Sequence, residues 1–225
     1  MKRNIDINEI SDGKRYGLND LVKADCADCS GCSACCRGMG NTIVLDPWDL
    51  FQLCRGTNKT PNELLEGCLE LRVVDGVILP NLKLTGTQES CPFLNAEGRC
   101  SIHPYRPGIC RLFPLGRIYE NRQVSYFLQT AECEKKTRGK IKVKKWLGVA
   151  EAKQYEHFVA DWHFLVVDVQ EEMDRRQDDA FRKECNMLLL QMFYLLPYDT
   201  AGDFYSQFQT RYDRIRSSLV EKTEE

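Results

Sequence analysis

The C-terminal third of the chain carries a helical pattern of apolar residues. No glycine or proline occurs from Val149 to Leu196. Within this stretch apolar residues recur at the spacing of one helix face, namely Tyr155, Phe158, Trp162, Leu165, Val166 and Val169. This periodicity predicts an amphipathic helix, and we assign its aromatic members to the core. A second helix is predicted over Ala180 to Leu196 and a third over Asp203 to Val220.

The middle of the chain predicts shorter elements. DPWDLFQLCRG has Asp46 as a helix N-cap and Gly56 as the expected end, and in TPNELLEG Thr60 and Glu63 form a capping box. VVDGVIL places apolar residues around Asp75-Gly76, and RIYENRQVSYF has the same form, so both predict hairpins. The fold class is therefore α+β: a small cysteine-rich domain of short helices and hairpins with a C-terminal helical extension. The predicted parts are residues 1–23, an N-terminal extension, 24–146, the cysteine-cluster domain, and 147–225, the helical region.

Composition and charge exclude several classes of protein. The 225 residues are 43% hydrophobic, and 31 Lys and Arg stand against 33 Asp and Glu. This balance gives no general attraction to nucleic acid or anionic lipid. The first residues are charged throughout, which is not the pattern of a secretory signal, and the longest apolar run, Met187 to Leu196, is shorter than the ~20 residues of a membrane-spanning helix. A cytoplasmic protein with reduced cysteines and no membrane partner is expected.

Cysteines are the most informative residues. Of the 12, all but Cys133 and Cys185 lie between Cys26 and Cys110. In CADCSGCSACC, two residues lie between successive members of the first four cysteines, a spacing that lets their thiolates reach one metal centre, and the fifth cysteine directly follows the fourth. The adjacent side chains of Cys35 and Cys36 diverge in an extended segment, which favours more than one metal atom. A second group, in CPFLNAEGRCSIHPYRPGIC, lies on a proline-stiffened segment, and we expect the two segments to meet in space.

These motifs resemble the YkgJ-type cysteine-cluster family, also described as the CxxCxxCC zinc- or iron-chelating domain. The resemblance covers residues 24 to 147 and rests on Cys29-x2-Cys32-x2-Cys35-Cys36-Arg37, Cys91-Pro92-Phe93-Leu94, Gly98-Arg99-Cys100, Arg106-Pro107-x2-Cys110-Arg111-x-Phe113-Pro114 and, more loosely, Cys133 before Trp146-Leu147. It implies metal chelation, and some relatives are linked to protein lysine methylation. The expected metal ligands are Cys29, Cys32, Cys35, Cys36, Cys91, Cys100, Cys110 and Cys133.

Two residues depart from the family pattern. His103 stands where an aromatic residue such as tyrosine is expected, and we do not assign it as a ligand. Cys26 extends the first run by one step, and whether it is a metal ligand or a non-coordinating residue is left open.

The other cysteines and histidines are not assigned as ligands. Cys54, Cys68 and Cys185 have apolar, helical surroundings typical of small core residues. His157 and His163, six residues apart, are not spaced to share one helix face as a metal pair.

The metal is open between an iron–sulfur cluster, such as 4Fe–4S, and zinc. Cys91-Pro92 supplies the remote cysteine followed by proline of ferredoxin-like runs, and the all-cysteine set favours iron–sulfur, while four thiolates also suit zinc. The leading hypothesis is a metal-binding protein with a polynuclear, cysteine-ligated centre. The alternatives are an enzyme, an iron–sulfur-dependent protein lysine methylase, and a zinc-stabilised interaction module. A protein partner or substrate is expected, and no catalytic residue is assigned. The sequence shows no glycine-rich strand-to-helix turn suited to a nucleotide-like cofactor, which weighs against the enzyme alternative.

Overall fold

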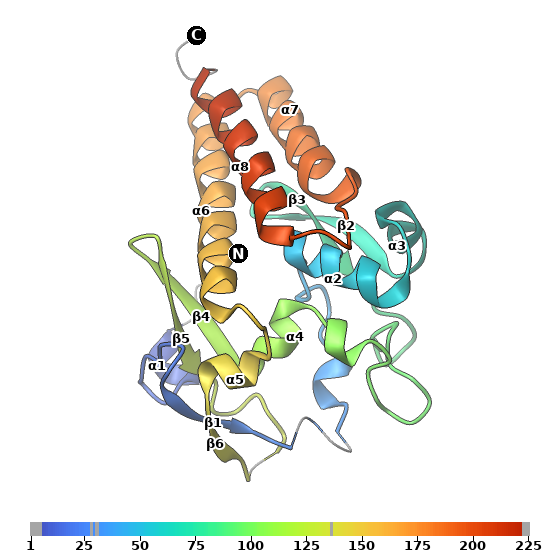
Figure 1. The fold of residues 1–225 in the computed structure, drawn as a ribbon, viewed down its shortest axis with the longest axis vertical. Helices are drawn as coiled ribbons and strands as arrows, with labels where there is room; N and C mark the ends of the chain where they lie inside the picture. Colours follow the sequence, from blue (N-terminus) through green and yellow to red (C-terminus); the bar gives the residue numbers. More distant parts are fainter. Residues whose placement is uncertain (1–5, 28, 30–31, 136, 222–225) are drawn as a thin grey trace.

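A computed structural model describes residues 6–27, 29, 32–135 and 137–221 (Figure 1). The α+β class is confirmed. The helices are α1 Ile7–Ile10, α2 Pro47–Thr57, α3 Pro61–Gly67, α4 Gly108–Leu112, α5 Val143–Leu147, α6 Ala152–Arg176, α7 Asp179–Leu190 and α8 Phe204–Glu221, with 3-10 turns η1 Ala34–Cys36 and η2 His103–Tyr105 and a π-helical turn η3 Gln191–Leu195. The strands are β1 Leu21–Asp25, β2 Leu69–Val74, β3 Val77–Leu82, β4 Leu115–Glu120, β5 Gln123–Leu128 and β6 Gly139–Lys142.

Capping residues start the two helices of the middle segment as predicted. Asp46 and Thr60 each accept a hydrogen bond from the third residue of the helix that follows, and that residue's side chain returns the interaction. The predicted end of α2 at Gly56 is wrong, because the helix runs to Thr57 and is closed by the left-handed Asn58. Gly56 has a packing role instead: a Cβ there would lie 2.6 Å from the Tyr105 ring.

The strands form three separate antiparallel pairs, β1–β6, β2–β3 and β4–β5. Both predicted hairpins are present. Asp75 and Gly76 form the β2–β3 turn with positive φ, as Asn121 and Arg122 do between β4 and β5. Positive φ at both central residues suits the twist of a tight hairpin turn.

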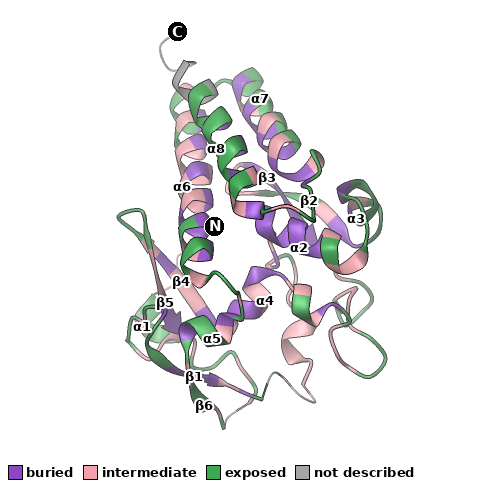
Figure 2. Cartoon of the chain, viewed as in Figure 1, coloured by how far each residue is buried: buried purple, intermediate pink, exposed green. Residues whose placement is uncertain are grey.

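Helices α6, α7 and α8 lie together above α2 and the β2–β3 hairpin (Figure 1). Their buried faces and the buried face of α2 form one large core (Figure 2). Aromatic rings join the two parts: Trp48 lies 4.9 Å from Tyr155 between ring centroids, and Phe51 lies 5.2 Å from Phe204. The Tyr194 hydroxyl also donates to the Leu45 carbonyl at 2.8 Å. The predicted C-terminal helices and the core position of their aromatic stripe are confirmed.

A second, smaller core lies beneath the first. It is built where β1, β5, α4 and α5 meet, and its members are Leu18, Val22, Ala24, Leu112, Leu115, Tyr126, Leu128, Val143 and Leu147.

Among the described residues, no helix has both the length and the apolar character needed to cross a membrane.

The larger core includes residues from both sides of the predicted boundary between residues 146 and 147. The boundary itself stays a prediction. The packing nevertheless means that α2, α3 and the β2–β3 hairpin share their apolar contacts with the C-terminal helices, so their stability does not depend on the cysteine segments alone.

Candidate metal centre

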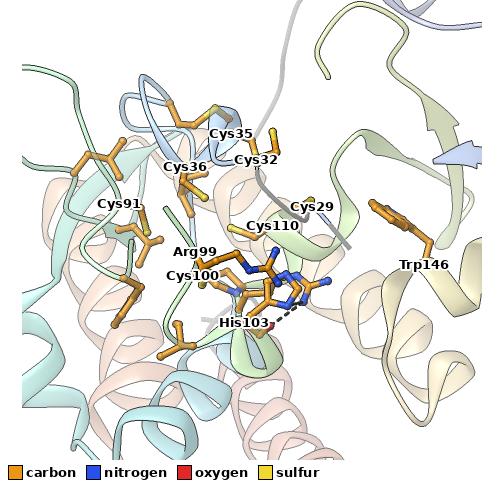
Figure 3. A pocket seen from close by; sticks show the side chains of 18 residues that line it. Cys29, Cys32, Cys35, Cys36, Cys91, Arg99, Cys100, His103, Cys110 and Trp146 are labelled. Atoms are coloured by element: carbon orange, nitrogen blue, oxygen red, sulfur yellow. Dashed lines mark hydrogen bonds between the residues drawn. The ribbon is translucent and has the colours of Figure 1, made fainter. Parts of the chain in front are cut away.

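Seven of the predicted ligands line one cavity, which we call the main cavity (Figure 3). They are Cys29, Cys32, Cys35, Cys36, Cys91, Cys100 and Cys110. The rest of the wall is largely apolar, with Met39, Ile43, Leu82, Leu84, Phe93, Ile102, Pro107 and Trp146, and its charged members are Arg99 and Arg106, with His103 beside them. The main cavity has a volume of about 70 Å³, several times the ~10–15 Å³ that one water requires. It has room for more than one atom.

The two cysteine segments meet at the pair Cys36 and Cys91. The backbone N–H of Cys91 donates to the Cys36 carbonyl at 2.9 Å. One residue further out on each side, Arg37 and Ser90 form an isolated β-bridge, and the Arg37 guanidinium donates to Ser90 Oγ at 2.8 Å. The expectation that the two segments meet in space is confirmed.

Backbone turns fold the second segment back on itself and bring Cys100 beside Cys91. The N–H of Leu94 donates to the Cys91 carbonyl at 3.0 Å, and Leu94 forms a β-bridge with Cys100. The loop is closed by the N–H of Ser101, which donates to the Phe93 carbonyl at 2.8 Å. These hydrogen bonds act together with the packing of Phe93 and Ile102 against the large core to hold this segment.

Cys110 reaches the main cavity from the short helix α4, which is anchored to α2. The carboxylate of Asp49, 2% exposed, accepts the N–H of Gly108 at 2.6 Å at the start of α4. Burial raises the pKa of Asp49 well above its usual value, and the charge of the neighbouring Asp46 raises it further. The neighbouring Arg111 places its guanidinium 5.2 Å from the Trp48 ring centroid. The core helix α2 therefore fixes the position of a candidate ligand.

We expect Gly108→Ala to destabilise the protein, because a Cβ there would lie 2.2 Å from the buried Tyr155 hydroxyl. Forcing an extra methyl group into a packed site costs about 1–3 kcal/mol. Gly67→Ala is the matched control: no atom lies within 4 Å of its added Cβ, and α3 should gain from alanine. Urea unfolding measures the free energy of unfolding of both variants. Equal values would contradict the prediction, because they would mean that α4 shifts to accommodate the added methyl group at no cost.

Cys133, the eighth predicted ligand, does not line the main cavity. It lines a smaller adjoining cavity, which we call the side cavity, together with Cys26 and with Cys29, Cys32 and Cys35 of the main cavity. Cys26 and Cys29 are close, with 3.6 Å between their sulfur atoms. Spacing alone left Cys26 open, and the structure places it among the predicted ligands.

The surroundings of the cavity thiols shift their pKa values in opposite directions. Burial is the largest cause that raises the pKa of Cys29 to about 12 and of Cys91 to about 11, and burial also raises the pKa of Cys110. Hydrogen bonding to Cys35 lowers the pKa of Cys36 to about 7 despite burial, with Arg37 and Arg99 acting in the same direction. Buried thiols that hold their protons this firmly give them up when a metal takes their place.

The chemistry of the donor set fits a metal that prefers sulfur. All of these cysteines are free thiols, and soft thiolate donors select zinc, copper(I) and iron–sulfur clusters. Within the described ranges, no group of three or more Cys, His, Asp or Glu side chains could hold an ion as it stands. The sulfurs surround the cavities without converging on one point, so binding requires the thiols to turn inward.

The main cavity is also lined by residues that are not in the expected ligand set, among them an imidazole, an indole and two guanidinium groups. His103, Arg99 and Trp146 line the main cavity, and the Arg106 guanidinium lies 3.0 Å from Nδ1 of His103. Arg99 and Trp146 lie in motifs that carry the family resemblance, and His103 lies between two of them, but nothing in their spacing indicates which way their side chains face.

The remaining cysteines and histidines lie elsewhere. Cys68 and Cys185 are in the large core, and Cys54 packs against it. His163 stacks on Tyr119 at 3.7 Å between ring centroids, and burial lowers its pKa to about 4.

A thiol-lined cavity of this kind defines a candidate metal-binding protein. The comparison with protein families agrees: a model of the family "CxxCxxCC: Putative zinc- or iron-chelating domain" matches residues 28–140, which is half of the chain. The chain belongs to this family, and membership supports metal binding. No curated protein and no solved structure matches the chain.

Proposed function

We propose that this protein binds a polynuclear, cysteine-ligated centre of the iron–sulfur type in the main cavity. The observation that carries the proposal is the number of sulfurs around one space: seven cysteines line it, whereas one zinc ion takes four ligands. The volume supports more than one metal atom, and the apolar wall excludes water, which protects such a centre. When bound, an iron–sulfur cluster supplies one-electron redox chemistry.

Within this set, Cys36, Cys91, Cys100 and Cys110 are the proposed cluster ligands. The backbone hydrogen bond between Cys91 and Cys36 and the bridge from Leu94 to Cys100 tie the first three together. Cys110 is within electrostatic reach of them, since its pKa is raised by burial and further by Cys91, Cys36 and Cys100. Four thiolates are the usual ligand set of a 4Fe–4S cluster.

Arginine side chains offset the negative charge that these thiolates would bring. Arg99 and Arg106 line the main cavity. Both act to lower the pKa of Cys100 against the larger effect of burial, and Arg99 and Arg37 lower that of Cys36. A cation within a few ångströms of a thiolate stabilises its charged form. These cations therefore offset part of the cost of ionising the buried thiols.

Purification of the full chain without oxygen tests the proposal. We expect a brown protein with thiolate-to-iron charge-transfer absorption and with iron and acid-labile sulfide in equal amounts, about four of each for a 4Fe–4S cluster. A colourless protein carrying stoichiometric zinc and no sulfide would overturn the iron–sulfur assignment. The zinc-loaded result would still leave the cysteines as the metal ligands.

A further inference from the structure

The side cavity has the features of a separate metal site. Five cysteines line it, of which Cys26 and Cys133 do not touch the main cavity. Its volume is about 20 Å³, close to the ~10–15 Å³ that holds one water. The space fits one ion, whereas the main cavity fits several atoms.

One sulfur pair already has the spacing of a metal-bound pair. Cys26 Sγ and Cys29 Sγ are 3.6 Å apart. In a tetrahedral site with metal–sulfur bonds of about 2.3 Å, the ligand sulfurs lie about 3.8 Å from one another. The two thiols thus form one edge of a coordination tetrahedron with little rearrangement.

Backbone hydrogen bonds hold Cys32 and the loop that carries Cys133 at the side cavity. The N–H of Cys32 donates to the Cys29 carbonyl at 3.0 Å, and both residues line the side cavity. Cys133 arrives from a loop far along the chain, which is held against the wall where the N–H of Gln129 donates to the Pro114 carbonyl at 3.0 Å. Pro114 itself lines the side cavity.

We propose that Cys26, Cys29, Cys32 and Cys133 bind a single zinc or ferrous ion in the side cavity, separate from the centre in the main cavity. This inference rests on the proposed function, because it divides one cysteine cluster into two sites. Cys29, Cys32 and Cys35 line both cavities; the division assigns the first two to the side cavity and leaves five cysteines, Cys35 included, around the main cavity. Four thiolates complete a tetrahedral site for either ion.

The division assigns eight of the nine cysteines that line the two cavities. The set Cys36, Cys91, Cys100 and Cys110 serves the main cavity, the second set serves the side cavity, and neither site requires a histidine. It gives Cys26 a function that the family motif does not require. It also explains why Cys133 lines a different cavity from the ligands of the second segment.

The test is metal analysis of the full chain with two matched double variants. Cys26→Ser with Cys133→Ser should lower the bound zinc plus iron by about one ion per chain and leave acid-labile sulfide unchanged. Cys91→Ser with Cys110→Ser should remove the sulfide instead. Cys54→Ser, a partly exposed cysteine that lines neither of these cavities, is the control and should change neither quantity.

A cobalt titration isolates the side cavity. Co²⁺ bound by thiolates in a tetrahedral site absorbs visible light, so the Cys91→Ser, Cys110→Ser chain should take up about one Co²⁺ with these bands. Adding Cys133→Ser should abolish them. Cys133 is partly exposed, and its replacement by serine leaves the core unchanged. Circular dichroism confirms folding of each variant.

The outcomes separate the two proposals. If the wild-type chain carries metal and the Cys26, Cys133 variant carries as much, the side site is wrong and the proposed function stands. If cobalt binds equally with and without Cys133, or fails to bind the Cys91, Cys110 variant at all, the side site is also wrong. If the wild-type chain takes up no metal, both proposals fail together.

Discussion

Cys110→Ser is expected to lower the affinity of the protein for its metal by at least about tenfold, since loss of a ligand's hydrogen-bond partner alone costs that much, and the metal content of the purified protein should fall as a result. Serine is smaller and a poor donor to soft metals, and Cys110 is fixed by α4 at the wall of the main cavity. The anchor of Gly108 on Asp49 limits any shift of another group into its place. Cys91→Ser should behave in the same way, because Cys91 is tied to Cys36.

The matched control is Cys185→Ser. Cys185 is 5% exposed in the large core and lines neither cavity. Its replacement tests what burying a hydroxyl in place of a thiol does to the fold, without touching the candidate centre. We expect lower stability and unchanged metal content. Equal metal loss in Cys185→Ser and Cys110→Ser would mean that metal retention follows overall stability, and the ligand assignment would be wrong.

Local chemistry explains which parts of the fold were predictable. The capping residues Asp46 and Thr60 and the turn at Asp75-Gly76 act within a few residues of themselves, so their sequence context determines them. The helix end predicted at Gly56 was wrong, because a glycine near a helix end does not always terminate the helix. Gly56 instead makes room for the ring of Tyr105, about fifty residues away, and no local sequence pattern contains that contact.

The sequence allowed us to predict which cysteines belong to the candidate site, but not how they are distributed between the two cavities. Spacing identified the cysteines, because two intervening residues are a local requirement for shared coordination. The separation of Cys133 from the main cavity depends on where the loop after β5 packs, and that is fixed by its contact with Pro114. Likewise, Cys26 joins the candidate ligands only because the structure places its sulfur atom 3.6 Å from that of Cys29.

Removal of the metal is expected to loosen the cysteine segments and leave the helical core folded. Read from the sequence alone, the whole region 24–146 would unfold, because its loops have little apolar periodicity. The structure narrows this expectation, since α2, α3 and the β2–β3 hairpin share one core with α6, α7 and α8. By contrast, turns and isolated bridges join residues 32–42 to residues 84–100, and the cysteines there are only partly buried.

Hydrogen exchange of the metal-loaded and metal-free chain measures this difference directly. Thiolate coordination contributes about 10 kcal/mol or more to the folding of small metal domains, so the amides of Cys32, Cys36 and Cys91, each hydrogen-bonded at the site, should lose most of their protection on metal removal. The amides of α2 and α6 should keep theirs and serve as the internal control. Equal protection of the Cys36 and Cys91 amides in both forms would show that packing alone holds the cavity, because a metal that shapes the site must slow the opening of the backbone around it.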